Sequence, residues 1–104
     1  MKIHVQNVGI TPRQELLDLI DEKLGKLDRF SDRIQEARVT LKVDKADDRN
    51  NKTLEVKLVI PGDDIFVKKT GESFEELVQK ISDTLQREIK DWKEKQDKKE
   101  KQRA

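Results

Sequence analysis

The chain has 104 residues, 43% of them charged and 33% hydrophobic, and its formal net charge at pH 7 is +1. This length predicts a single domain with a modest core, and the near-neutral total argues against strong nonspecific binding to DNA. Because the sequence contains no cysteine, it excludes a disulfide framework and a thiolate metal site. The start lacks the apolar run of a signal peptide, and the longest aliphatic run, residues 58–60, is far too short for a membrane span. These features favour a cytoplasmic protein with no membrane partner.

A strand and a helix are predicted in the first third of the chain. Residues 2–8 alternate apolar and polar side chains, which is typical of a strand with one buried face. Thr11 and Gln14 predict a capping box at the start of a helix that ends near Asp28 or Arg29. Gly25 interrupts this helix, and we expect it to permit close packing of the backbone. The apolar stripe of the helix is formed by Leu16, Leu17, Ile20, Leu24 and Leu27.

Three further strands are predicted in the middle of the chain. Apolar and polar residues alternate over residues 39–43, 54–60 and 65–67. The first two of these segments are separated by residues 45–52, which are polar and rich in turn-forming types, and which we expect to be mobile. A tighter turn at 61–64 separates the second and third segments.

A long amphipathic helix is predicted from Ser73, which forms a second capping box with Glu76. Its apolar residues recur every three or four positions: Phe74, Leu77, Val78, Ile81, Leu85, Ile89 and Trp92. The predicted order is β-α-β-β-β-α, an α+β fold in which both helices cover one face of a four-stranded sheet and the other face is polar. We expect residues 1–96 to form a single domain and residues 97–104 to form a charged, mobile tail.

The sequence offers little for catalysis. His4 is the only histidine and lies in the first predicted strand, so no Ser/His/Asp or Cys/His set can be assembled. The aspartate pairs at 47–48 and 63–64 lie in turn sequence, without the ligand spacing of an EF-hand. No glycine loop for phosphate binding is present. We therefore expect a protein that is not an enzyme and has no cofactor, metal or small-molecule substrate.

Basic residues carry more information, because they are unevenly distributed. Residues 87–104 contain eight basic and five acidic residues. At helical spacing, one flank of the long helix carries Lys80, Thr84, Arg87, Asp91, Lys95 and Lys98, and the first helix region carries Lys23, Lys26, Arg29 and Arg33. If the two helices pack side by side, these sets could border one groove for a polyanion. The alternative is a solvated helix with Glu–Lys pairs, and charge alone favours that alternative. Trp92 is interpreted as a core or hinge residue rather than a platform for stacking bases.

Several segments together resemble the ribosome hibernation promoting factors, also called ribosome-associated inhibitors or sigma-54 modulation proteins. The resemblance covers nearly the whole chain and rests on the order and spacing of these segments. They are residues 10–12, 22–30, 59–62, 66–67, 73–76, 85–90 and 93–95.

The resemblance implies a fold similar to double-stranded RNA-binding domains. It also implies a function: binding to the small ribosomal subunit and its rRNA in the channel used by messenger and transfer RNA, and hibernation of idle ribosomes under stress and in stationary phase. Pairing of ribosomes could then require a separate ribosome-dimerising factor. Position by position, the resemblance implies these RNA-binding residues: Lys23, Lys26, Arg29, Arg87, Lys90, Lys93 and Lys95.

The chain departs from the family pattern in three places. Val5 and Gln6 stand where many members have a small residue followed by a basic one. Thr84 and Asp91 stand where basic residues are common, so two or three positive charges are missing from the expected RNA face. The chain also ends soon after the last helix, which is similar to the short form of the family. The alternative function is a regulatory protein-interaction module that makes no direct contact with RNA.

Overall fold

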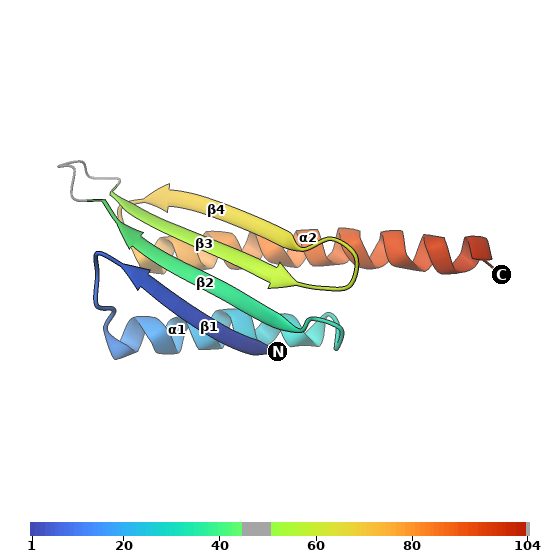
Figure 1. Ribbon diagram of the computed structural model, residues 1–104, viewed down its shortest axis with the longest axis horizontal. Helices are drawn as coiled ribbons and strands as arrows, with labels where there is room; N and C mark the ends of the chain where they lie inside the picture. The colour runs from blue at the N-terminus through green and yellow to red at the C-terminus, as the bar shows by residue number, and fades with distance from the viewer. Residues whose placement is uncertain (45–50, 104) are drawn as a thin grey trace.

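The chain folds into one four-stranded sheet with two helices on the same face, as Figure 1 shows. The computed structural model describes residues 1–44 and 51–103, and side chains as far as Gln96. The elements in chain order are β1 (Lys2–Val8), α1 (Gln14–Gly25), the short 3-10 helix η1 (Lys26–Arg29), β2 (Glu36–Val43), β3 (Lys52–Val59), β4 (Ile65–Gly71) and α2 (Phe74–Arg103). The predicted α+β order is thereby confirmed.

The sheet is mixed, with the strands in the order β1-β2-β3-β4. β1 and β2 are parallel because α1 lies between them as a crossover, whereas β2, β3 and β4 follow one another as antiparallel strands. The register places four valines in one row across the sheet: Val5, Val39, Val56 and Val67.

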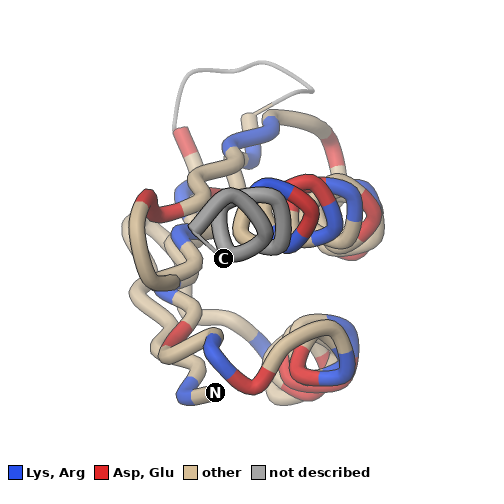
Figure 2. Tube along the Cα trace, turned by 90° about the vertical axis from the view of Figure 1, so that its right-hand side faces the viewer, with Lys and Arg blue, Asp and Glu red and all other residues tan. Residues whose placement is uncertain are grey.

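The core lies between the sheet and the helices. Alternate residues of the central strands point inward and are fully buried, among them Ala37, Leu41 and Leu58. The predicted apolar stripe of α2 is buried along its whole length, from Phe74 to Trp92. Viewed along their axes, both helices lie on one side of the sheet (Figure 2), so the opposite face of the sheet is left open.

The start of α1 differs from the predicted capping box. Arg13 is the N-cap residue, its backbone is extended, and no side chain caps the helix. The Arg13 carbonyl accepts the amide of Leu17 at 3.2 Å, and the Gln14 side chain donates to Asp18 at 2.9 Å instead of closing a box with Thr11. The box prediction was wrong because the helix starts later than it requires.

Gly25 does not serve the close packing that was expected. It is the last residue of α1 and has ordinary helical backbone angles, with φ −59° and ψ −30°. A Cβ atom at this position would meet nothing within 4 Å. A Cβ atom, as in alanine, is therefore sterically acceptable there.

The start of α2 follows the prediction in part. Ser73 Oγ accepts the amide of Glu76 at 3.4 Å, as an N-cap residue does. The Ser73 hydroxyl in turn donates to Glu75 at 2.8 Å. At its other end, α2 extends past the ends of the strands and the β3–β4 turn (Figure 1). Side chains of the predicted tail, 97–104, lie outside the described residues, as do residues 45–50 of the predicted mobile turn.

Candidate nucleic-acid interface

Two contacts between cations and aromatic rings join the end of α1 to the middle of α2. The ammonium group of Lys90 lies 5.6 Å from the centre of the Phe30 ring, and the guanidinium group of Arg33 lies 5.0 Å from the centre of the Trp92 ring. Each contact pairs a residue just after η1 with a residue of α2. The two segments that carry the predicted basic residues are therefore neighbours in space, and they meet at Lys90 and Arg33.

Trp92 fixes the position of α2 at this point. Its side chain is only 8% exposed, and its indole N–H donates to the carbonyl of Pro61 in the β3–β4 turn at 3.1 Å. The prediction that Trp92 is a core residue and not a base-stacking platform is confirmed, since its ring is covered by the core and by Arg33.

The predicted basic residues of the first helix region extend from α1 into η1. Lys23 is half-buried, whereas Lys26 and Arg29 are exposed. Lys26 forms a long ion pair of 3.9 Å with Glu22, one turn earlier. An exposed pair of this kind contributes little to stability, so the Lys26 ammonium group remains available to an anion.

The predicted basic residues of α2 do not all face the same way. Lys90 faces α1, since it contacts Phe30, and Lys93 lies nearly one turn further along the same flank. Lys95 lies five residues after Lys90, a rotation of about 140° around the helix axis. It lines a depression of about 280 Å³ against the β3–β4 turn instead.

The sequence predicted a groove between α1 and the flank of α2 that carries Lys95. In the structure, α1 instead faces the flank that carries Lys90. The residues at the helical spacing of Lys95, including Asp91, border the depression beside the turn and not α1. Thr84 belongs to the same flank by helical spacing, and its hydroxyl donates to the Lys80 carbonyl at 3.0 Å. Thr84 and Asp91, where the family pattern would place further cations, thus lie away from α1. Their lack of positive charge does not affect the flank that carries Lys90.

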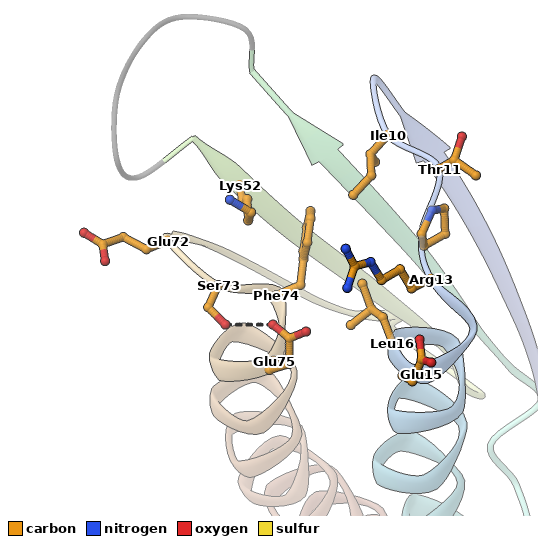
Figure 3. Close-up of a pocket in the computed structure, with 11 residues that line it drawn as sticks. Ile10, Thr11, Arg13, Glu15, Leu16, Lys52, Glu72, Ser73, Phe74 and Glu75 are labelled. Carbon is orange, nitrogen blue, oxygen red and sulfur yellow. Dashed lines mark hydrogen bonds between the residues drawn. The ribbon is translucent and has the colours of Figure 1, made fainter.

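At the opposite end of the two helices lies a pocket of about 460 Å³ that no sequence motif indicated. Figure 3 shows it between the starts of α1 and α2, with Arg13 extending toward α2. Its rim includes Arg13 and Lys52 but also three glutamates, Glu15, Glu72 and Glu75. This mixed charge is a poor match for a polyanion.

Glu75 is the one described side chain with a clearly shifted pKa. A hydrogen bond with the Glu75 backbone lowers its pKa most, followed by the bond from Ser73, and burial opposes both. Lys52 and Arg13 lower the pKa further. The carboxylate is therefore held in its charged form at the start of α2, where the helix dipole also favours negative charge.

Two further site classes have no support in the part of the chain that is described. No group of three or more His, Asp or Glu residues there is placed to hold a metal ion. None of the helices searched is long and apolar enough to cross a membrane.

Comparison with known proteins identifies the family. Residues 3–97 match the family described as sigma 54 modulation protein / S30EA ribosomal protein. The chain belongs to this family. Among relatives of this S30EA-family protein, a ribosome hibernation promotion factor of Deinococcus radiodurans is 36% identical over 91 residues, which are 85% of this chain and 46% of that protein. The chain thus spans about half the length of that relative. A ribosome hibernation promoting factor of Pseudomonas putida is 28% identical and is covered to 90%, over 92% of this chain.

Solved structures share the fold. A ribosomal subunit interface protein from Coxiella burnetii aligns with a TM-score of 0.79 at 18% identity, over 89% of this chain and 98% of that one. The N-terminal domain of Thermus thermophilus Protein Y aligns with a TM-score of 0.75 at 20% identity, over 88% and 99%. At these identities the structures support the fold of the S30EA-family protein and nothing finer.

Proposed function

We propose that this S30EA-family protein binds rRNA of the small ribosomal subunit in the channel used by messenger and transfer RNA, and thereby holds idle ribosomes in hibernation. The names of the relatives support a role in ribosome hibernation. The observation that carries the proposal is the cluster of cations where η1 meets the middle of α2. We call it the basic corner, and it consists of Lys23, Lys26, Arg29, Arg33, Lys90 and Lys93. Arg87 lies outside it, because helical spacing puts Arg87 on the flank of α2 with Lys80 and Asp91.

The basic corner suits folded RNA because its charges come from two rigid elements. Phe30 and Trp92 lie beneath Lys90 and Arg33 and restrict how far each cation can move. Acidic residues of α2 such as Glu88 and Asp91 lie on the other flank, beside Lys95. Cations held in this way neutralise clustered phosphates, and the shape of the RNA rather than its base sequence decides the fit. Lys95 would then contact RNA only where the rRNA wraps around α2.

Inhibition in this proposal is steric and requires no catalysis. A domain seated in the channel excludes messenger and transfer RNA for as long as it stays bound, so neither a cofactor nor a substrate is needed. The protein would act in the cytoplasm, where the ribosomes are. Pairing of ribosomes would depend on a separate dimerising factor.

Co-sedimentation with small ribosomal subunits tests the proposal. We expect the wild-type protein to pellet with subunits at low salt, and Lys90→Glu to weaken binding about tenfold. Lys80→Glu is the matched control, since Lys80 is also an exposed lysine of α2 but lies outside the basic corner. A protein that stays in the supernatant, or an equal weakening in the two variants, would refute the proposal.

A salt titration of the same complex separates RNA contact from docking on a ribosomal protein. Binding through phosphates weakens by about 0.9 units of log K per log unit of salt for each phosphate neutralised in duplex regions. A largely apolar protein interface would respond weakly, and a flat titration would favour the protein-interaction module.

A further inference from the structure

The open face of the sheet carries a row of side chains that the proposed function leaves unexplained. The register places His4 beside Arg38, Arg38 opposite Lys57, and Lys57 opposite Phe66. One residue from each strand therefore forms a line across the whole sheet, about 14 Å long at the usual strand spacing. All four side chains lie on the face of the sheet opposite the buried one, because their neighbours along each strand point into the core. Phe66, on the edge strand, also borders the depression that Glu88, Asp91 and Lys95 of α2 line.

This row of side chains does not help to stabilise the folded sheet. Like charges directly opposite each other destabilise a sheet, and Arg38 and Lys57 are such a pair. Their charges are balanced only from outside the row, by Glu36 on Arg38 at 2.7 Å and by Asp64 on Lys57 at 3.4 Å. Residues that disfavour the local structure and give no gain in stability are expected at functional sites.

Phe66 is equally unexplained by folding. It is 59% exposed and is one of two large apolar side chains that the described residues leave open to solvent. It lies on the edge strand β4, at the end of the row and next to Lys57. An exposed aromatic ring beside cations is the arrangement with which proteins stack unpaired bases and neutralise the adjoining phosphates.

The charge of the whole open face has the sign that such a ligand requires. The four strands place five Lys or Arg side chains and two glutamates on this face: Lys2, Arg38, Lys42, Lys57 and Lys68 against Glu36 and Glu55. The surplus is positive although the chain as a whole carries only +1. No described side chain forms an ion pair with Lys68, which follows Phe66 as the next residue of β4 on the same face.

We propose that the open face of the sheet is a second RNA-binding surface, on which Phe66 stacks an unpaired base while Arg38 and Lys57 contact its flanking phosphates. The ligand class is single-stranded RNA. This surface lies on the opposite side of the molecule from the basic corner, so the domain can contact two RNA segments at once. The inference extends the proposed function but does not depend on which RNA the basic corner binds.

The test measures binding of a fluorescent, unstructured RNA of roughly 10 nucleotides by anisotropy, with a duplex of the same length for comparison. We expect Phe66→Ala to weaken single-strand binding roughly tenfold and to leave duplex binding unchanged, since paired bases cannot stack on the ring. Val8→Ala is the matched control, because Val8 is the other exposed apolar side chain and lies at the far edge of the same face.

A double variant tests the cations. Arg38→Gln with Lys57→Gln is expected to lower the slope of log K against log salt by about 0.7 for each phosphate that is no longer neutralised. Unchanged single-strand affinity in both Phe66→Ala and the double variant, with native circular dichroism, overturns the inference, as does equal weakening on duplex and single strand. Lys90→Glu separates the two proposals: it should reduce subunit binding while the oligonucleotide keeps its dependence on Phe66.

Discussion

Trp92 should be the largest single contributor to the attachment of α2 among the aromatic residues, and its replacement gives a quantitative test. A tryptophan side chain buries about 150–250 Å², worth roughly 4–6 kcal/mol at about 25 cal/mol per Å². Because Trp92 is only 8% exposed, almost all of this area is buried in the folded protein. Trp→Ala substitutions in protein cores cost about 3–5 kcal/mol, so we expect Trp92→Ala to lower the free energy of unfolding by about 4 kcal/mol.

A conservative variant separates the hydrogen bond from the packing. Trp92→Phe keeps most of the ring but removes the donor to Pro61, and a typical net hydrogen bond is worth about 0.5–1.5 kcal/mol. Pro61 is exposed, so water can reach its carbonyl when the indole is absent. We therefore expect Trp92→Phe to cost about 1 kcal/mol.

Urea unfolding followed by far-ultraviolet circular dichroism measures both effects, since Trp92 is the only tryptophan and fluorescence disappears with it. Phe66→Ala is the control, because it removes an aromatic ring that is 59% exposed and should cost less than about 0.5 kcal/mol. A decrease below about 1 kcal/mol for Trp92→Ala, or one no larger than that of Phe66→Ala, would show that Trp92 does not anchor α2.

Three further changes probe the helix ends, each read from the urea midpoint. Gly25→Ala should stabilise the protein by about 0.5–1 kcal/mol, because the backbone is helical and a Cβ meets nothing; a decrease in stability would mean that Gly25 has a packing role. Ser73→Ala should cost about 1 kcal/mol by removing the N-cap of α2, and no change would show that the cap is idle. Glu75→Gln should destabilise the protein at neutral pH but not in acid: the folded state lowers the pKa of Glu75, so its contribution is present above the unfolded value near 4.5 and is lost as the pH falls through the folded value. An equal decrease at neutral and acid pH would contradict this account.

Residue patterns predicted the elements because each pattern is local. The apolar spacing of α2 and the cap at Ser73 both operate within a few residues, and both are present in the structure. The Thr11–Gln14 box was mispredicted because the same residue types fit a helix that begins earlier. Local spacing alone does not choose between the two starts.

The site depended on information that is not local. Whether Lys90 or Lys95 faces α1 is set by the side from which α1 packs on α2, which spacing along one helix does not reveal. The row from His4 to Phe66 requires the register of all four strands, and its members are 62 positions apart in the sequence at the extremes. Neither could be deduced from charge or hydrophobicity read along the chain.

The mixed sheet has a consequence for the order in which the molecule assembles. β2, β3, β4 and α2 are consecutive in the chain, so they can form one unit through short connections. β1 joins its parallel neighbour β2 only after a much longer loop has closed around α1, which makes this contact slower to form. The basic corner lies where these two units meet. Lys23 and Lys26 belong to the unit with β1 and α1, which joins last, and Lys90 belongs to α2, which forms early. In this order of assembly, the proposed RNA-binding surface at the basic corner is complete only after α1 has packed on α2.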